Sequence, residues 1–312
     1  MRYDELPDIL ARQFEETCAS FTTLRAADSV RRQYQGSMRW KRVRQIDYLI
    51  RVRADGRQRS LGARSVATEQ RYAAFVAGKA AANERYRALA DEMKRQRQVN
   101  KALRIGHVPA TWIDILNGIS ACGLDDHVIV TGAAATYAYE SAAGMRLRGG
   151  DSENDNEDDS DGVLADRRGR LQLAALRMEA GIAVLGLLQQ VDSSFVMCHD
   201  SRYVAVNRGG LEVEVLFAAA NEDLRGLLNA PRFVQPVLGS NGVMAMMTAP
   251  DPRFFALQKL RAANQLDRNE KQRASDAMLA RVALSMARQR MPASPGPTST
   301  ATAAAHDEVA AL

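Results

Sequence analysis

The chain has 312 residues, of which 46% are hydrophobic and 25% are charged, with a formal net charge of +5. These proportions are those of an ordinary globular protein, and they exclude a collagen-like, a disulfide-rich or a wholly disordered chain. The length predicts one or two domains. Three cysteines without a C-x-x-C pair support neither a disulfide framework nor a cysteine zinc site. The sequence also has no apolar signal core and no uninterrupted apolar stretch long enough to span a membrane, so we expect a cytoplasmic protein.

Opposite charges are segregated along the chain. Residues 25–64 contain twelve Lys or Arg and three Asp, a local net charge of +9. Residues 151–161 read DSENDNEDDSD, with seven carboxylates and no basic side chain. The pattern predicts a basic module and, far from it in the sequence, an acidic loop.

The first third of the chain predicts a helical module that carries a hairpin. Apolar residues at helical spacing indicate a helix over residues 4–24, and a second pattern without proline indicates one long helix over residues 65–104. Between them, DYLIRVR and RQRSLG flank an Asp55-Gly56 pair, which is typical of a β-hairpin. Many positions of the long helix's seam are polar, which favours packing on its own domain over a coiled-coil dimer.

After Pro109 the elements become short and alternate between helix and strand. The predicted strands are 127–131, 162–165, 194–198, 203–207, 211–217 and 243–247, and the predicted helices are 111–122, 133–142, 175–190, 252–265 and 270–289. We therefore expect an α+β fold, a mixed β-sheet flanked by helices, preceded by the helical and hairpin module. The expected domains are 1–108, 109–290 and a disordered tail over 291–312, which is rich in Pro, Ser, Thr and Ala.

Several common catalytic motifs are absent. The sequence has no P-loop, no G-x-G-x-x-G that opens a helix after a strand, no H-E-x-x-H and no G-x-S-x-G. Its four histidines lie far apart, and an EF-hand register on the acidic run would put Arg168 where a glutamate must bind calcium.

Carboxylates on predicted strands are the remaining candidates for chemistry. Asp159 and Asp161 are two residues apart, and so are Glu212 and Glu214, so each pair shares one face of an extended strand. If the strands adjoin, the carboxylates converge, and hard oxygen ligands of this kind favour Mg²⁺ or Mn²⁺. Two such ions are a common solution for phosphoryl or nucleotidyl transfer. The alternative is a solvated acidic loop and the wet face of a half-buried strand.

Blocks spread over residues 47–280 resemble a bacterial family of nucleotidyltransferase-fold proteins within the polymerase-beta-like superfamily. They read RADGRQRSLGARS, VNKALRIGHVP, VTGAAATYAYESAAG, RRGRLQLA, RYVAVNRGGLEVEVL, LLNAPRF and APDPRFFALQKL. The resemblance implies that Gly132 and Ala133 lie beside a nucleoside triphosphate, where backbone N–H groups must hold the phosphates because Ala133 has no hydroxyl. It also implies that Asp159 and Asp161 bind the metal ions and that Glu214 completes the site.

Two functions follow as expectations. The first is Mg²⁺- or Mn²⁺-dependent transfer of a nucleotidyl group from an NTP to an unidentified acceptor. Asp159, Asp161 and Glu214 would be catalytic, and Lys259 would neutralise phosphate charge. Arg273 and Asp276, three residues apart on the last helix, are predicted to form a surface pair.

The second is a catalytically degenerate fold that binds nucleic acid or another partner through the basic module. The predicted contacts are Arg51, Arg53, Arg57 and Arg59. Arg39-Trp40-Lys41 and Tyr48 supply aromatic faces beside cations, a mix suited to nucleic acid. The alternative is a solvated hairpin or an internal partner for the acidic loop.

Overall fold

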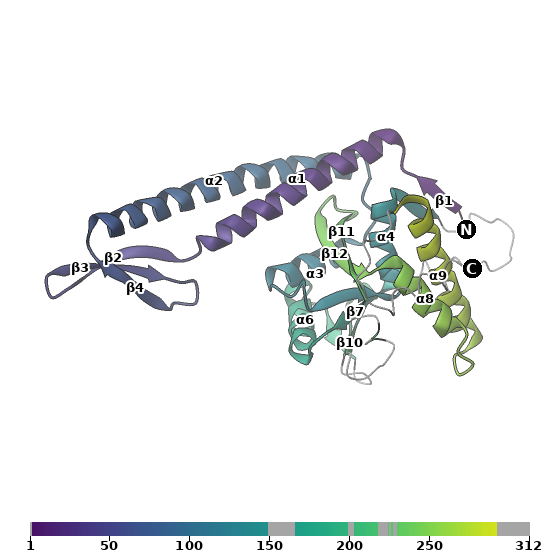
Figure 1. Ribbon diagram of the computed structural model, residues 1–312. Coiled ribbons are helices and arrows are strands. Elements are labelled where there is room, and N and C mark those ends of the chain that lie inside the picture. The colour runs from purple at the N-terminus through teal and green to yellow at the C-terminus, as the bar shows by residue number, and fades with distance from the viewer. Residues whose placement is uncertain are drawn as a thin grey trace. The chain divides into compact units, whose positions relative to one another are not determined.

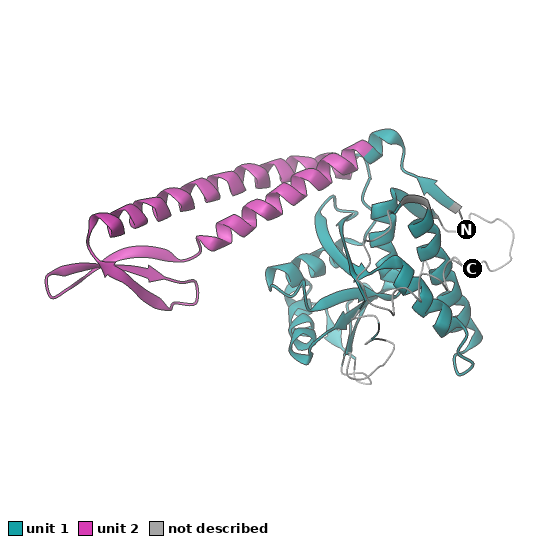
Figure 2. Cartoon of the chain, viewed as in Figure 1, with its two compact units in different colours: residues 1–11, 103–312 teal, residues 12–102 magenta. Residues whose placement is uncertain are grey.

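The computed structural model describes residues 2–148, 166–198, 203–217, 224, 226 and 230–291. The chain divides into two compact units (Figure 2): unit 2 is Arg12–Ala102, and unit 1 comprises Met1–Ala11 and Leu103–Leu312. The mixture of helices with a mixed sheet confirms the predicted α+β class. None of the helices in the described ranges is long and apolar enough to cross a membrane.

Unit 2 is a helical hairpin with a small sheet at one end (Figure 1). Helices α1 (Asp8–Gln33) and α2 (Val66–Ala102) run antiparallel, and the chain between them forms an antiparallel sheet of strands β2, β3 and β4. The bounds of these strands are Ser37–Val43, Ile46–Val52 and Gln58–Ala63. The long helix predicted over residues 65–104 is confirmed, whereas the predicted first helix begins later and extends to Gln33.

The two helices contact each other at both ends of the hairpin. Near one end, Thr17 Oγ1 donates to Asn100 Oδ1 at 3.1 Å, and Gln13 Nε2 donates to Gln96 Oε1 at 2.5 Å. Near the other end, the rings of Tyr34 and Phe75 lie 5.7 Å apart. Helix α2 therefore packs against α1 of its own chain.

The sheet of unit 2 packs one face on α2. Trp40 lies against Tyr72, with ring centroids 6.0 Å apart, and Leu49 is fully buried. The predicted turn at Asp55-Gly56 is confirmed, and Gly56 has the left-handed φ of +79° that glycine adopts without strain. Strand β2, which the sequence did not predict, pairs along the other side of β3.

Unit 1 contains a five-stranded mixed sheet in the order β5-β7-β10-β9-β8 (Figure 1). Strands β7 and β10 are parallel, and the other neighbours are antiparallel. The bounds are Val128–Thr131 for β5, Arg170–Ala175 for β7, Val196–Met197 for β8, Val204–Val206 for β9 and Glu212–Phe217 for β10. Because β5 runs against β7, the carboxyl end of β5 and the amino ends of β7 and β10 lie at the same edge of the sheet.

Two short ribbons complete the strands of unit 1. Strand β1 (Arg2–Glu5) pairs with β6 (Met145–Arg148), and β11 (Arg232–Leu238) pairs with β12 (Met244–Pro250). The helical segments are α3 (Ala110–Ala121), η1 (Gly132–Ala135), α4 (Thr136–Ala143), α6 (Met178–Val191), α8 (Pro252–Ala263) and α9 (Glu270–Arg290). The predicted strand at 162–165 and the predicted tail from 292 lie outside the described residues.

The core of unit 1 contains large aromatic side chains from three helices. Trp112 of α3 meets Tyr137 of α4 edge to face at 5.5 Å, and Tyr139 meets Phe255 of α8 at 5.7 Å; all four are almost fully buried. Helix α8 begins where Asp251 accepts the backbone N–H of Arg253 at 2.9 Å, with proline at the first helical position.

Candidate functional site

The strand β10 separates its polar and apolar side chains by alternation. Val213, Val215 and Phe217 are buried in the core, whereas Glu212 and Glu214 lie together on the opposite face and are partly exposed. This confirms the face assignment made from LEVEVLF. The polar face of the sheet is therefore the place to look for chemistry.

One row of side chains crosses three strands on this face. Thr131 at the end of β5 is opposite Gln172 of β7, which is opposite Glu214 of β10. Gln172 Nε2 donates to Glu214 Oε2 at 2.8 Å. The amide thus holds the orientation of the carboxylate, while the carboxylate keeps further lone pairs for a ligand.

Gly132 directly follows Thr131 in the chain, and its backbone conformation favours glycine. Its φ is +64°, and a Cβ placed on it would lie 2.0 Å from Gln172 Oε1. The backbone then turns into η1 and α4, and Thr131, which precedes η1, gives no side-chain cap. Backbone N–H groups at such a helical N-terminus attract anions. Ala133 is the next residue and is 4% exposed.

A second row carries more charge at the same edge. Arg170 Nη2 lies 2.7 Å from Glu212 Oε1. Asp166 precedes β7, and the pKa of its carboxyl is raised, first by desolvation and then by repulsion from Glu212 and Glu214, against attraction to Arg170 and Lys259. The edge therefore combines carboxylates with nearby cations.

The segment that leads into β7 is tied to helix α4 by a buried ion pair. Arg167 Nη1 lies 2.9 Å from Glu140 Oε1, and its guanidinium lies over the Tyr137 ring at 4.0 Å from the centroid. Glu140 also accepts from His107 Nε2 at 2.8 Å and from the backbone N–H of Leu147 at 2.6 Å. Burial alone would raise the pKa of Glu140, but Arg167 and His107 outweigh it and the pKa is lowered. Residues 166–169 are thus fixed beside α4.

The structure brings together three of the predicted site residues. Gly132, Ala133 and Glu214 all lie around the row described above. Asp159 and Asp161 lie outside the described residues, so their roles stay a prediction. Within the described ranges, no three His, Cys, Asp or Glu side chains are grouped so that they could hold a metal ion.

Lys259 is engaged by the last helix. Its Nζ lies 2.7 Å from Asp276 Oδ1, and Arg268 Nη1 lies 2.9 Å from the other oxygen of the same carboxylate. The predicted surface pair of Arg273 with Asp276 is therefore wrong: Asp276 is 5% exposed and bridges α8 to the residues before α9. The spacing in the sequence suggested a surface pair because it showed only the neighbours on one helix.

Sequence reasoning missed four residues of this region. Gln172 and Arg170 lie on β7, which was not predicted as a strand, and Asp166 and Arg167 directly precede it. The alternation of Leu171 and Leu173 with polar residues in RLQLAA was the available signal.

The four arginines predicted to contact nucleic acid differ in exposure and in their hydrogen bonds. Arg51 donates to the backbone oxygens of Gln35, Ser37 and Val52 and lies over the Phe75 ring at 4.4 Å, so it holds the sheet to the helices. Arg53, Arg57 and Arg59 are exposed, and Arg57 lies 3.6 Å from Asp55. Their contact with nucleic acid stays a prediction.

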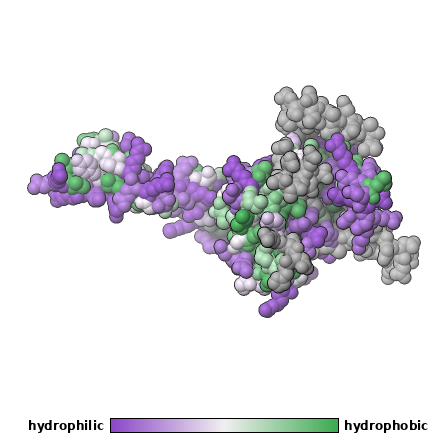
Figure 3. Space-filling model, turned by 90° about the horizontal axis from the view of Figure 1, so that it is seen from below, coloured by the Kyte–Doolittle hydropathy of each residue, from purple (hydrophilic) through white to green (hydrophobic). Residues whose placement is uncertain are grey.

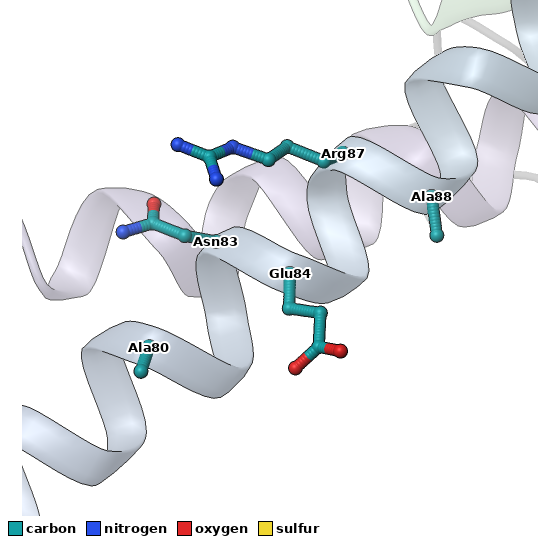
Figure 4. A pocket seen from close by; sticks show the side chains of 5 residues that line it. All are labelled: Ala80, Asn83, Glu84, Arg87 and Ala88. Carbon is teal, nitrogen blue, oxygen red and sulfur yellow. The ribbon is translucent and has the colours of Figure 1, made fainter.

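A hollow of about 620 Å³ lies along α2 (Figure 4). Its lining comes from helix α2 alone, and the side chains of Glu84 and Arg87 point in different directions rather than into one site. It has no second element to orient a ligand, and we assign it no chemistry. The lining residues are Ala80, Asn83, Glu84, Arg87 and Ala88.

Comparison with known proteins identifies the family. A family model described as Nucleotidyltransferase matches residues 111–225 and 216–303, which together span more than half of the chain and include the whole row from Thr131 to Glu214. Searches of curated proteins and of solved structures gave no match. Because the family model matches residues 111–303, the chain belongs to the nucleotidyltransferase family.

Proposed function

We propose that unit 1 transfers a nucleotidyl group from an NTP to an acceptor in a reaction that depends on Mg²⁺ or Mn²⁺. One observation supports this best: the Glu214 carboxylate and the glycine turn at Gly132 lie at one row of the sheet, joined by Gln172. In a member of this family, an acidic side chain beside a glycine turn that follows a strand supports a metal and phosphate site at this edge.

Each residue of the row has a definable role in this proposal. Backbone N–H groups from Gly132 and Ala133 hold triphosphate oxygens. Gln172 positions Glu214, because its amide donates to one carboxylate oxygen and its Oε1 packs on Gly132. Lys259 lies near enough to Asp166 to oppose the rise in the pKa of that carboxyl, and its charge adds to the attraction for phosphate.

The metal requirement rests on the donor set. Glu214 is a hard oxygen ligand of the type that Mg²⁺ prefers, and its hydrogen bond from Gln172 leaves it further acceptor capacity. It is one ligand of the three that we propose, and Asp159 and Asp161, which lie outside the described residues, are the other two. A divalent ion bound there would neutralise charge on the triphosphate during transfer.

The test is transfer of label from each of four α-³²P-labelled NTPs to protein, nucleic-acid and small-molecule acceptors, with Mg²⁺ or Mn²⁺ and with EDTA. Asp161→Asn and Glu214→Gln keep shape and remove charge, so we expect each to lower kcat by roughly 100-fold or more with little effect on NTP affinity. Glu212→Gln is the matched control, because it removes a neighbouring charge that Arg170 already engages. Metal-dependent transfer that survives Asp161→Asn unchanged would refute the assignment.

A second candidate function, binding of nucleic acid without transfer, is favoured by the charge of unit 2. Residues 12–102 contain 21 Lys or Arg and nine Asp or Glu, a net charge of +12, whereas the rest of the chain has 21 and 28, a net charge of −7. Nucleic acid held by such a unit would be released between roughly 50 and 200 mM salt. Salt-dependent binding without bound divalent metal or transfer would favour this candidate over the first.

A further inference from the structure

The sheet of unit 2 has a face that points away from α2. Met38, Arg51 and Arg59 are opposite one another and share the face that bears Trp40 and Leu49, the side that packs on α2. The alternate residues therefore lie on the outward face. We define the outward face by four rows: Ser37, Val52 and Gln58; Arg39, Ile50 and Ser60; Lys41, Tyr48 and Ala63; Val43 and Ile46.

The outward face carries uncompensated positive charge. Arg39 and Lys41 are exposed neighbours on β2, and none of the eleven residues in the four rows is acidic. Asp47, the one carboxylate on β2–β4, lies on the helix side, where Arg42 and Arg64 are within 3.8 and 3.5 Å of it. The attraction that this face offers to an anion is therefore not cancelled within the sheet.

An apolar strip runs beside these cations along the central strand. It consists of Ile46, Tyr48 and Val52 of β3, joined by Val43 of β2. Tyr48 and Val52 are partly exposed, whereas Ile50, which lies between them on this face, is buried. Val43 and Ile46 are 45% and 48% exposed. The space-filling view shows hydrophobic side chains gathered among hydrophilic ones over this end of unit 2 (Figure 3).

The turn between β2 and β3 presents one more cation at the end of the face. Arg44 and Gln45 both have positive φ, +47° and +69°, as the two-residue turn of this hairpin type requires. Glycine and asparagine take these positions at lower cost. Arg44 thus has an exposed guanidinium at the tip of the hairpin, next to Val43 and Ile46.

We propose that the outward face binds single-stranded nucleic acid, with Arg39, Lys41 and Arg44 on phosphates and a base stacked on Tyr48. Cations beside an aromatic ring match a strand that offers phosphates and unstacked bases together. A duplex keeps its bases stacked and gives the strip nothing to contact. The inference deepens the nucleic-acid candidate above and rests on it, and it does not require transfer activity.

The proposal keeps Tyr48 from the sequence prediction but replaces Arg51 and Arg59 as the phosphate contacts. Arg51 is committed to backbone oxygens and to Phe75, and Arg59 is opposite it on the same face. The two predicted residues with the clearest strand positions therefore lie on the other side of the sheet from Tyr48.

The experiment measures binding of a fluorescein-labelled 20-nucleotide oligo(U) and of a blunt RNA duplex of equal length to the full chain by anisotropy, without divalent ions or NTP. We expect tighter binding of oligo(U). Arg39→Ala with Lys41→Ala should lower the slope of log K against log salt by about 1.4, since each phosphate contact contributes about 0.7 on single strands. Arg85→Ala with Arg87→Ala removes the same charge from exposed positions of α2 and is the matched control.

Tyr48 separates stacking from charge. Tyr48→Phe should bind as the wild type does, and Tyr48→Leu, which keeps the apolar packing, should bind about 10-fold more weakly. The proposal for this face would be overturned if the Arg39/Lys41 double variant and the Arg85/Arg87 control lost affinity equally, or if Tyr48→Leu lost none. Either result would leave nucleic-acid binding by unit 2 intact. Absence of binding by the wild type at 20 mM salt would overturn both, and neither result bears on transfer by unit 1.

Discussion

Arg167 and Glu140 form an ion pair in which both side chains are almost wholly buried, at 5% and 0% exposure. Glu140 lies on α4, which follows the glycine of the candidate site, and Arg167 lies three residues before the start of β7. The pair therefore holds the residue that leads into β7 against α4, on the side of the sheet edge where Gly132 and Glu214 lie.

Glu140→Gln should destabilise unit 1 by about 3 kcal/mol at neutral pH, because it leaves Arg167 buried without its counter-charge. The pKa of Glu140 is lowered from an ordinary value of 4.5, so its contribution is present above the unfolded pKa and is lost as the pH falls through the folded pKa. The difference between wild type and variant should thus narrow on acidification below about pH 4.5. Urea unfolding at several pH values measures it, with the exposed Glu179→Gln as control. A difference that stays constant with pH would contradict the interpretation.

Gly132→Ala should cost about 3 kcal/mol, part from the left-handed φ and part from the clash with Gln172. Gly144 separates the two contributions: it has the same φ of +64° with no heavy atom within 4 Å of an added Cβ. Gly144→Ala should therefore cost only about 1 kcal/mol. In a Gln172→Ala background, which removes the clash, Gly132→Ala should cost about as much as Gly144→Ala when unfolding free energies are measured by chemical denaturation. If Gly132→Ala keeps its larger cost there, the clash with Gln172 is not its cause.

Arg51→Ala should loosen the sheet of unit 2 by about 2 kcal/mol, because three backbone oxygens lose a charged donor. Hydrogen exchange of the β2 and β3 amides reports this directly. Arg59→Ala, opposite it in the register and exposed, serves as the control and should leave exchange unchanged. Equal exchange in the two variants would show that Arg51 has no structural role.

Cys18 should resist alkylation in the folded chain. Partial burial, with a smaller contribution from Glu15, raises the pKa of its thiol to about 12, so little thiolate is present at pH 8. Cys122 is exposed and serves as the internal reference. Iodoacetamide labelling followed by mass spectrometry should show Cys18 reacting at least roughly 10-fold more slowly, and urea should abolish the difference. Equal rates in the native protein would argue against the burial of Cys18.

The elements that the sequence predicted well are those whose signal is local. The long helix, the Asp55-Gly56 hairpin and the alternation in β10 follow from spacing and turn chemistry within one segment. Strand β11 was missed because Pro236 lies within it, and proline argues against a strand unless it lies where no ladder donor is needed. The pairing of β1 with β6 joins Arg2 to Arg148 and Glu5 to Met145, far apart in the chain, and has no local signal.

The candidate site was predicted in part for the same reason. Glu214 and Gly132 follow from strand and turn patterns, but Gln172, which joins them, depends on β7 lying between their strands. That order is a property of the sheet and not of any one segment. The partner of Lys259 was likewise hidden, since Asp276 reaches it from another helix.

The hydrogen-bonded cluster between α1 and α2 sets how the two helices align. Thr17 and Asn100 are almost fully buried and hydrogen-bonded to each other. If one helix slid past the other by a turn, these polar groups would lose their partners, at a cost in folding free energy of about 1–3 kcal/mol each. At the other end, Gly78 makes room for Tyr34, whose hydroxyl would lie 2.5 Å from an added Cβ. Both ends of the hairpin thus accept a single register. The distance between the end of α1, which β2 follows, and the start of α2, which β4 precedes, is thereby fixed. The two helix ends therefore set where the outer strands of the sheet begin and end.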